Sequence, residues 1–453
     1  MLENYDVVVV GGGLAGSIAS RELKNCGLSS VVLEARDRLG GRVYTSEFDG
    51  TTVELGGAWV HWTQPHMWSE VNRYGLELIE SGALSSKNSP VHLGSGLDLT
   101  PKTLDETEER FAWIANGKLK MSTARDVFAK LNSAIDMMCE NTYDLITRPH
   151  EIFYRDLSSL ESMTVKDKIE TLNLDQETRD LVDGIITTVC GTKTENTSLL
   201  SVVRWYALCG YSARILWDCE ERYKIKGGIQ PMIEAIASEG GDIRLSTPVV
   251  SIHQDDQSVL VETENGNKIK AKAVIVTAPV NAMNTIKFTP ELSEHKKAVV
   301  DDKLPCRGFK IWAKVKGIHN YVATAGSKYP LSFIATEFHV DGHTLCYGFG
   351  PDSDIINLNS TSEVAKAVNS LMPDVEVVDS LVHDWADDKY SQGIWSMPRP
   401  GQLTKYAKHM QSPDGRIFLA GADFAQGWLG FMDGALESGM KTARKVARSG
   451  LVS

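Results

Sequence analysis

The amino-acid sequence predicts an α/β protein in which two domains are interleaved along the chain. The N-terminus has the pattern of a strand, a glycine-rich turn and a helix, which is how a βαβ unit begins. Short continuous apolar runs at 273–279 and 417–421 are typical of buried parallel strands. Residues 247–271 and 307–349 instead alternate in polarity like antiparallel strands. Because parallel-type runs occur at both ends and the middle, each domain is expected to combine distant segments.

The first βαβ unit is predicted at the start of the chain. One strand runs from Tyr5 to Val10 and the next from Ser30 to Glu34. The helix between them ends at Gly27, and its apolar residues recur at helical spacing. These residues are Ala15, Ile18, Ala19 and Leu23. The turn between strand and helix has the size that a bound phosphate group needs.

The segment from about 104 to 220 is predicted to be largely helical. Its apolar residues recur at helical spacing, as in Val127, Leu131, Ala134, Ile135 and Met138. Residues 85–102 are rich in Ser and Gly and contain two prolines without any period, which indicates a surface loop.

Charge and cysteine usage exclude several function classes. The 453 residues include 47 Lys and Arg against 59 Asp and Glu, a net charge of −12. Nucleic acids and anionic membranes attract proteins with a positive field, so a small-molecule partner is expected instead. The seven cysteines are scattered singly, which argues against a zinc site or a disulfide framework and predicts no metal centre. We expect buried thiols in a reducing compartment; they are Cys26, Cys139, Cys190, Cys209, Cys219, Cys306 and Cys346.

The chain shows no sign of export or membrane insertion. Residues 1–6 contain two acids and no base, whereas a secretory signal needs a basic start. No run reaches the roughly 18 apolar residues that span a bilayer. A cytoplasmic protein is therefore expected, and it could form a homodimer.

The glycine-rich turn carries the first chemical signal. Gly11, Gly13 and Gly16 form G-x-G-x-x-G between a strand and a helix, where the backbone approaches a pyrophosphate closely. Glu34 ends the second strand, and a carboxylate there can accept hydrogen bonds from both hydroxyls of an adenosine ribose. An acid at this place would repel the 2′-phosphate of NADP.

Two more glycine segments follow, and with them the sequence resembles the FAD-dependent amine oxidases. Arg36-Asp-Arg-Leu-Gly40-Gly41-Arg42 offers flexible backbone and a guanidinium that can pair with pyrophosphate. Glu54-Leu-Gly-Gly57-Ala58-Trp59-Val60 provides a second glycine pair. In this family, which includes monoamine and polyamine oxidases, the first segment follows the ribose-binding acid and the second passes the flavin. The resemblance implies FAD rather than NAD.

The resemblance extends over much of the chain and implies a set of cofactor-binding residues. Gly421-Ala-Asp423 and Gly430–Ala435 are similar to the closing motif of the family, in which an acid faces the ribityl chain and a helix N-terminus meets the flavin. A positive helix end there would stabilise the reduced, negative flavin. Gly227-Gly228 and Pro248-Val249 fit the strand that touches adenine. The implied FAD contacts are Gly11, Gly13, Leu14, Ala15, Gly16, Glu34, Ala35, Arg36, Gly40, Gly41, Arg42, Gly57, Ala58, Trp59, Val60, Val249, Ala278, Trp395, Gly421, Asp423, Gly430, Phe431, Met432 and Ala435.

The same resemblance implies three catalytic residues. Lys310 matches the lysine that holds a water against flavin N5, and Trp395 and Phe431 match the two aromatic walls around the substrate nitrogen. The alternative is an exposed lysine and two core aromatics. The implied reaction moves a hydride from the carbon beside nitrogen to the flavin, giving an imine or iminium, with reoxidation by O2 to hydrogen peroxide or by an electron carrier.

Departures from the family pattern bear on how FAD is attached and narrow the range of possible substrates. Ile394 stands where monoamine oxidases carry the flavin-linking cysteine, so FAD is expected to be non-covalent. Amino-acid oxidases have an arginine near Trp59-Val-His61-Trp, and its lack disfavours an α-amino acid. The overall motif pattern resembles that of bacterial oxidases of nicotine and related alkaloids. His61 leaves polyamines open as substrates. Arylalkyl monoamine substrates and a non-catalytic FAD-binding scaffold are further alternatives. Candidate substrate contacts are His61, Thr188, Tyr206, Tyr211 and Phe333.

The implied architecture is a Rossmann-like FAD-binding domain interleaved with an α+β substrate domain of helices and antiparallel sheet. The FAD-binding domain is expected to comprise residues 1–80, 222–290 and 390–453. The substrate domain is expected to comprise residues 81–221 and 291–389.

Overall fold

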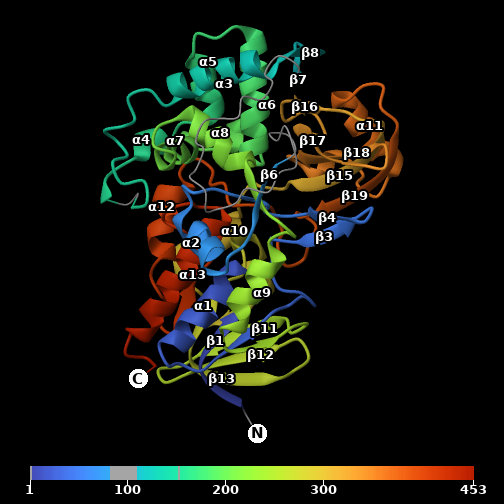
Figure 1. Cartoon of the computed structure of the whole chain (residues 1–453). Helices are drawn as coiled ribbons and strands as arrows, with labels where there is room; N and C mark the ends of the chain where they lie inside the picture. Colours follow the sequence, from blue (N-terminus) through green and yellow to red (C-terminus); the bar gives the residue numbers. More distant parts are fainter. Residues whose placement is uncertain (1–2, 82–109, 152–153, 453) are drawn as a thin grey trace.

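The computed structural model of the chain describes residues 3–81, 110–151 and 154–452. Two main sheets dominate it, one in the lower half of Figure 1 and one in the upper right. The predicted loop at 85–102 lies outside the described residues. Among the described residues, none of the helices is both long enough and apolar enough to cross a bilayer.

The lower sheet has the order β10-β2-β1-β13-β12-β11-β14, with β20 beside β13. Val7–Val10 of β1 lie parallel to β2 on one side and to Ala273–Val276 of β13 on the other. This confirms that apolar runs far apart in sequence pair in parallel within one sheet, in which β12 runs antiparallel to β11 and β13. The strands are β1 (Glu3–Val10), β2 (Ser30–Leu33), β10 (Asp242–Arg244), β11 (Val249–Gln254), β12 (Val259–Thr263), β13 (Lys268–Val276), β14 (Lys287–Thr289) and β20 (Ile417–Leu419).

The upper sheet has the order β19-β15-β18-β17-β16-β7-β8, and its pairs are antiparallel except β16 with β7. The alternating pattern at 307–349 is thereby confirmed. The strands are β7 (Arg110–Ala115), β8 (Lys118–Thr123), β15 (Phe309–Lys316), β16 (Tyr321–Thr324), β17 (Phe333–Val340), β18 (His343–Gly350) and β19 (Val377–Asp384). Two small sheets join the halves, β3 (Thr45–Phe48) with β4 (Thr51–Glu54), and β9 (Tyr223–Ile225) between β5 (Trp59–Val60) and β6 (Leu78–Glu80).

The prediction that residues 104–220 are largely helical was wrong at its start. Strands β7 and β8 precede the helices, because the short apolar run after Arg110 is buried on both faces and such a run does not distinguish a strand from a helix. The helices of the upper half are α3 (Ala124–Met138), α4 (Ser158–Glu161), α5 (Val165–Thr171), α6 (Gln176–Cys190), α7 (Leu199–Leu208), α8 (Ala213–Glu221) and α11 (Thr361–Leu371).

Side-chain caps fix where several of these helices begin. Thr164 and Asp167 form a capping box on α5, and Asp175 accepts from the Thr178 N–H at the start of α6. Gly191 then ends α6 in the left-handed conformation, with φ of 61°. This end of α6 matters for the site because it lies beside Trp395.

The helices of the lower half cover the lower, mixed sheet. Helix α1 packs along α13, so the first and last long helices of the chain are neighbours (Figure 1). These helices are α1 (Leu14–Asn25), α2 (Pro65–Arg73), α9 (Gln230–Ser238), α10 (Glu294–Asp302), α12 (Gln402–Met410) and α13 (Met432–Ala447).

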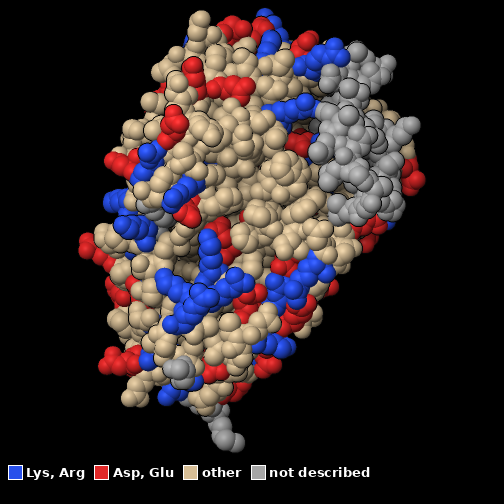
Figure 2. Space-filling view, turned by 60° about the vertical axis from the view of Figure 1, so that its left-hand side comes forward, with Lys and Arg blue, Asp and Glu red and all other residues tan. Residues whose placement is uncertain are grey.

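The charged side chains are unevenly distributed over the surface, and all but one of the cysteines are buried. Figure 2 shows basic side chains gathered in the lower part of one face with acidic ones among them, so the negative net charge is not uniform. The expectation of buried thiols holds for six cysteines, but Cys26 is exposed. Cys26 caps the C-terminus of α1, where the chain turns back to the sheet at the surface.

Candidate active site

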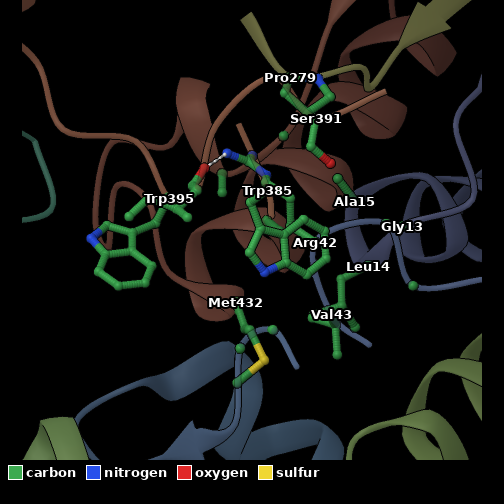
Figure 3. A pocket seen from close by; sticks show the side chains of 18 of the residues that line it. Gly13, Leu14, Ala15, Arg42, Val43, Pro279, Trp385, Ser391, Trp395 and Met432 are labelled. Atoms are coloured by element: carbon green, nitrogen blue, oxygen red, sulfur yellow. Dashed lines mark hydrogen bonds between the residues drawn. The ribbon is translucent and has the colours of Figure 1, made fainter. Parts of the chain in front are cut away.

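A cavity of about 290 Å³ lies where the two main sheets meet, and residues from both ends and the middle of the chain line it. Most of the predicted cofactor and catalytic residues are brought together there. They are Gly11, Gly13, Leu14, Ala15, Glu34, Ala35, Arg36, Gly40, Gly41, Arg42, Gly57, Ala58, Trp59, Val249, Ala278, Lys310, Trp395, Gly421, Gly430, Phe431, Met432 and Ala435, with the candidate substrate contact Thr188. In Figure 3, Trp395 and the glycine-turn residues Gly13 and Leu14 lie on opposite sides of the view.

The glycine turn and Glu34 form one rigid unit at one end of the cavity. Glu34 accepts hydrogen bonds from the N–H groups of Gly12 at 2.6 Å and Arg36 at 2.8 Å. A Cβ atom at Gly16 would lie 1.9 Å from the Gly11 carbonyl oxygen, so only glycine allows this approach of helix to turn. The buried Glu34 carboxylate lines the cavity, and each of its oxygens can accept one more hydrogen bond. The unit therefore fits the ribose and pyrophosphate of a dinucleotide.

Arg42 is held by the residue that the sequence assigned to the ribityl chain. Its guanidinium donates to Asp423 Oδ1 at 2.7 Å and to the Ile394 carbonyl at 2.8 Å, the bond drawn in Figure 3. The second oxygen of Asp423 accepts from the Val280 N–H at 2.9 Å. Asp423 lies outside the cavity lining. Its role in the structure is to hold Arg42 against the cavity wall.

The N-terminus of helix α13 forms another wall. Gly430, Phe431, Met432 and Ala435 line the cavity there. A helix of 16 residues presents unpaired N–H groups and partial positive charge at this end. The wall can therefore stabilise negative charge in a bound ring system.

Lys310 lies on β15 and is 3% exposed. Its Nζ atom donates to the Gly56 carbonyl at 3.1 Å and lies 4.8 Å from the Trp59 ring centre and 5.2 Å from that of Phe349. Burial and the nearby positive charge of Lys224 lower the pKa of Lys310 to about 7. A lysine in this state can hold a proton or release it near neutral pH.

Lys224 is a second buried lysine that also lies against the Trp59 ring. It pairs with Glu337 Oε1 at 2.8 Å, and its Nζ lies 4.9 Å from the Trp59 ring centre. Glu337 also accepts from the Ser81 hydroxyl at 2.8 Å. No sequence motif marked this pair, because the two residues meet only through packing of the small sheet against the upper sheet.

Trp395 and Phe431 both face the cavity, and their neighbours fix their orientation. Trp395 donates its ring N–H to the Val189 carbonyl at 3.0 Å and packs edge-on against Phe349. Phe431 packs edge-on against Trp428 and Trp205, with ring centres 4.9 and 5.4 Å away. Both rings are therefore held in place rather than free to rotate.

Some predicted contacts lie elsewhere. Tyr206 donates its hydroxyl to Asp136 at 2.8 Å, Tyr211 bonds the Ile146 carbonyl, and His61 is fully buried with Nε2 3.1 Å from Asp218. The polar end of each of these three side chains bonds a partner outside the cavity, and this bond holds the side chain away from the cavity. The predicted contacts outside the lining are Gly16, Val60, His61, Tyr206, Tyr211, Phe333 and Asp423.

The structure also adds lining residues that the sequence did not reveal. Phe349 faces Lys310 across β15 and β18, and that register could have been suspected from their alternation. Trp385 donates its ring N–H to the Leu55 carbonyl. The other additions include Tyr390, Ser391, Cys219, Glu220 and Glu221; no sequence signal distinguishes them.

Comparison with known proteins identifies the family. Residues 14–447 match the model of the flavin-containing amine oxidoreductases. The chain belongs to this family. It is therefore an enzyme that uses FAD to oxidise amines.

Sequence relatives and a solved structure support the assignment to this family. A pseudooxynicotine dehydrogenase of a Pseudomonas species is 35% identical over 98% of this chain and 86% of its own length. A (S)-6-hydroxynicotine oxidase of Paenarthrobacter nicotinovorans is 29% identical, covering 96% of this chain and 97% of its own. The fold is similar to that of cyclohexylamine oxidase from Brevibacterium oxydans, with a TM-score of 0.79 over 98% of this chain and 99% of that one at 21% identity. The predicted fold class, a Rossmann-like FAD-binding part interleaved with an α+β part, is thus confirmed.

Proposed function

We propose that this amine oxidase acts on a nicotine-like substrate, a cyclic or secondary amine attached to a flat aromatic ring. The observation that carries the proposal is the meeting of Trp395, Phe431 and the buried Lys310 in one cavity. Relatives named for nicotine, pseudooxynicotine and 6-hydroxynicotine support the choice of amine. His61, which left polyamines open as substrates, bonds Asp218 outside the cavity and gives that alternative no support.

The residues of the cavity have distinct tasks in this proposal. Trp395 and Phe431 receive the amine between ring faces, where its cation is attracted but the apolar walls favour the neutral form that can react. When bound, FAD supplies the acceptor for the hydride from the carbon beside nitrogen. Lys310 holds a water by hydrogen bonding and, with a pKa of about 7, exchanges a proton near neutral pH. The product is an imine or iminium, which water hydrolyses.

The remaining features of the proposal concern the cofactor and its surroundings. We propose non-covalent FAD, because Ile394 offers no nucleophile beside Trp395. Residues 1–80, 222–290 and 390–453 form the FAD-binding part, and residues 81–221 and 291–389 form the substrate part. The acceptor of the electrons is O2 or a carrier, since relatives bear both names, oxidase and dehydrogenase. A cytoplasmic location completes the proposal.

The test is an anaerobic titration of the flavin absorbance with amines. We expect nicotine-like amines to bleach the flavin faster than polyamines, arylalkylamines or amino acids. Acid precipitation should release the FAD into the supernatant, and rapid mixing of the reduced enzyme with O2 separates an oxidase from a dehydrogenase. Bleaching by polyamines alone would overturn the choice of substrate.

A further inference from the structure

Residues 385–394 lead from the end of strand β19 to Trp395, and part of this segment lines the cavity. Ser391 is one of its lining residues (Figure 3). Asp388 belongs to the same segment but lies outside the lining. Any effect of Asp388 on a ligand must therefore pass through another residue.

Asp388 holds one edge of the Arg36 guanidinium. The Nη2 atom of Arg36 donates to Asp388 Oδ1 at 2.5 Å and to the Ser391 hydroxyl oxygen at 2.9 Å. The side chains of Arg36 and Asp388 are only 13% and 14% exposed, so water competes little with this charge-assisted hydrogen bond. Arg36 is thereby oriented before a ligand binds.

Asp388 is itself held in place as an anion. The Tyr390 N–H donates to its Oδ1 at 2.9 Å, the Gln392 N–H donates to its carbonyl at 2.9 Å, and His383 Nε2 lies 3.6 Å from its Oδ2. Burial alone would raise the pKa of Asp388, but the contacts with His383 and Arg36 outweigh burial and lower the pKa to about 2. The carboxylate therefore keeps its charge throughout the neutral pH range.

The opposite edge of the Arg36 guanidinium is left for a ligand. Its Nε–H and the two Nη1 N–H groups have no hydrogen-bond partner among the residues that the structure describes. Nη1 lies 3.9 Å from Glu34 Oε1, which is beyond hydrogen-bond length. Arg36 and Glu34 both line the cavity, and Glu34 is the acid expected to bind the ribose hydroxyls. A free guanidinium edge beside a ribose site fits the neighbouring phosphates of FAD, because a guanidinium binds a phosphate with two parallel N–H bonds.

We propose that Asp388 is a positioning residue for the cofactor, which holds Arg36 ready to bind the diphosphate of FAD. A guanidinium that is already oriented loses less side-chain entropy when the ligand binds. Asp388 also repels the phosphates, but its charge is paired with Arg36 and lies outside the lining, so the gain from orientation outweighs the repulsion. The inference rests on the non-covalent FAD of the proposed function, because only a cofactor that can dissociate needs to be retained in this way.

Binding of FAD and of ADP to the apoenzyme tests this role. ADP carries the adenosine and both phosphates of FAD but no flavin, so its affinity reports this end of the site alone. Both dissociation constants are measured by titration calorimetry of the apoenzyme. Asp388→Asn keeps the shape of the side chain and removes its charge, and it should raise both constants by about tenfold, the difference between a charged and a neutral acceptor. Ser391→Ala removes the other acceptor of Arg36 Nη2 and should raise them by about threefold or more, so the test does not depend on the folding of one variant.

A double-mutant cycle separates positioning from a general structural effect. In an Arg36→Gln background, Asp388→Asn should change the ADP dissociation constant by less than about twofold, because the residue through which it acts is gone. Asp388→Glu restores a carboxylate and should bring the constant to within about threefold of the wild-type value. Asp387→Asn removes the same charge from the exposed neighbouring residue and is the matched control, for which both constants should stay within about twofold.

Several results would overturn the proposal. Losses of equal size with and without Arg36 would show that Asp388 only stabilises the fold, and tighter binding of ADP by Asp388→Asn would show that repulsion dominates. Unchanged affinity in both Asp388→Asn and Ser391→Ala, with FAD released by acid, would overturn the role of Asp388 alone. FAD that stays with the acid-precipitated protein would overturn the proposed attachment and, with it, this role.

Discussion

Replacing Lys224 by methionine should raise the pKa of Lys310 and shift the pH profile of flavin reduction to higher pH. The two Nζ atoms lie 4.9 and 4.8 Å from the same Trp59 ring centre, so they are at most about 10 Å apart. Two like charges at that separation repel by about 1.7 kcal/mol at an effective dielectric constant of about 20. Removing one of them therefore raises the pKa of the other by about one unit or more.

Glu337→Gln is the matched variant with the opposite sign. Its carboxylate attracts the protonated form of Lys310, so its loss should lower the pKa of Lys310 and move the profile to lower pH. The assay is rapid mixing of oxidised enzyme with saturating amine under anaerobic conditions at a series of pH values. Each variant is first checked for flavin content and thermal unfolding. An unchanged midpoint in both variants would refute the view that the pair of Lys224 with Glu337 sets the protonation of Lys310.

Three further variants test how the site is folded and how much the buried Lys310 destabilises the protein. Gly16→Ala should yield protein without flavin absorbance, because the new Cβ would lie 1.9 Å from the Gly11 carbonyl oxygen; normal FAD content would contradict this. Gly191→Ala, at φ of 61°, would place its Cβ 2.2 Å from Ile394 Cδ1 and 3.0 Å from the ring of Trp395. It should slow flavin reduction by about tenfold or more while FAD stays bound, and an unchanged rate would show that Ile394 and Trp395 are not positioned by this turn. Lys310→Met should slow flavin reduction by about 100-fold or more and raise the melting temperature at pH 7. The native pKa of about 7 lies below the ordinary 10.5, so between these values the unfolded chain binds the extra proton and wild-type stability increases with pH; thermal unfolding from pH 7 to 9 should lose that slope in the variant.

Features set by local sequence could be predicted before the structure. The first βαβ unit follows from the spacing of apolar residues and glycines, and Glu34 follows from its place at the end of the second strand. Lys310, Trp395 and Phe431 came from resemblance to the family rather than from any local pattern. Their place in one cavity needed the structure.

Features that depend on packing between distant segments could not be predicted. Lys224 and Glu337 meet across two sheets, and Glu220 and Glu221 have the composition of an ordinary solvated helix end. Tyr206 was predicted to contact the substrate, and this prediction was wrong because its hydroxyl is bonded to Asp136 and the residue lies outside the cavity lining. For a residue with a polar tip, the partner of that tip decides which way the side chain points, and one sequence does not show the partner.

The packing of α1 along α13 has a consequence for the biosynthesis of the enzyme. The wall formed by Phe431, Met432 and Ala435 leaves the ribosome 420 residues or more after the glycine turn at Gly11. At about 5–20 residues per second this separation lasts roughly 20–90 s. A complete FAD site therefore cannot form before α13 has emerged from the ribosome. A chain that stops short of α13 would contain most of the core yet remain colourless, so the yellow colour of an expression culture reports chains that include α13 rather than total protein made.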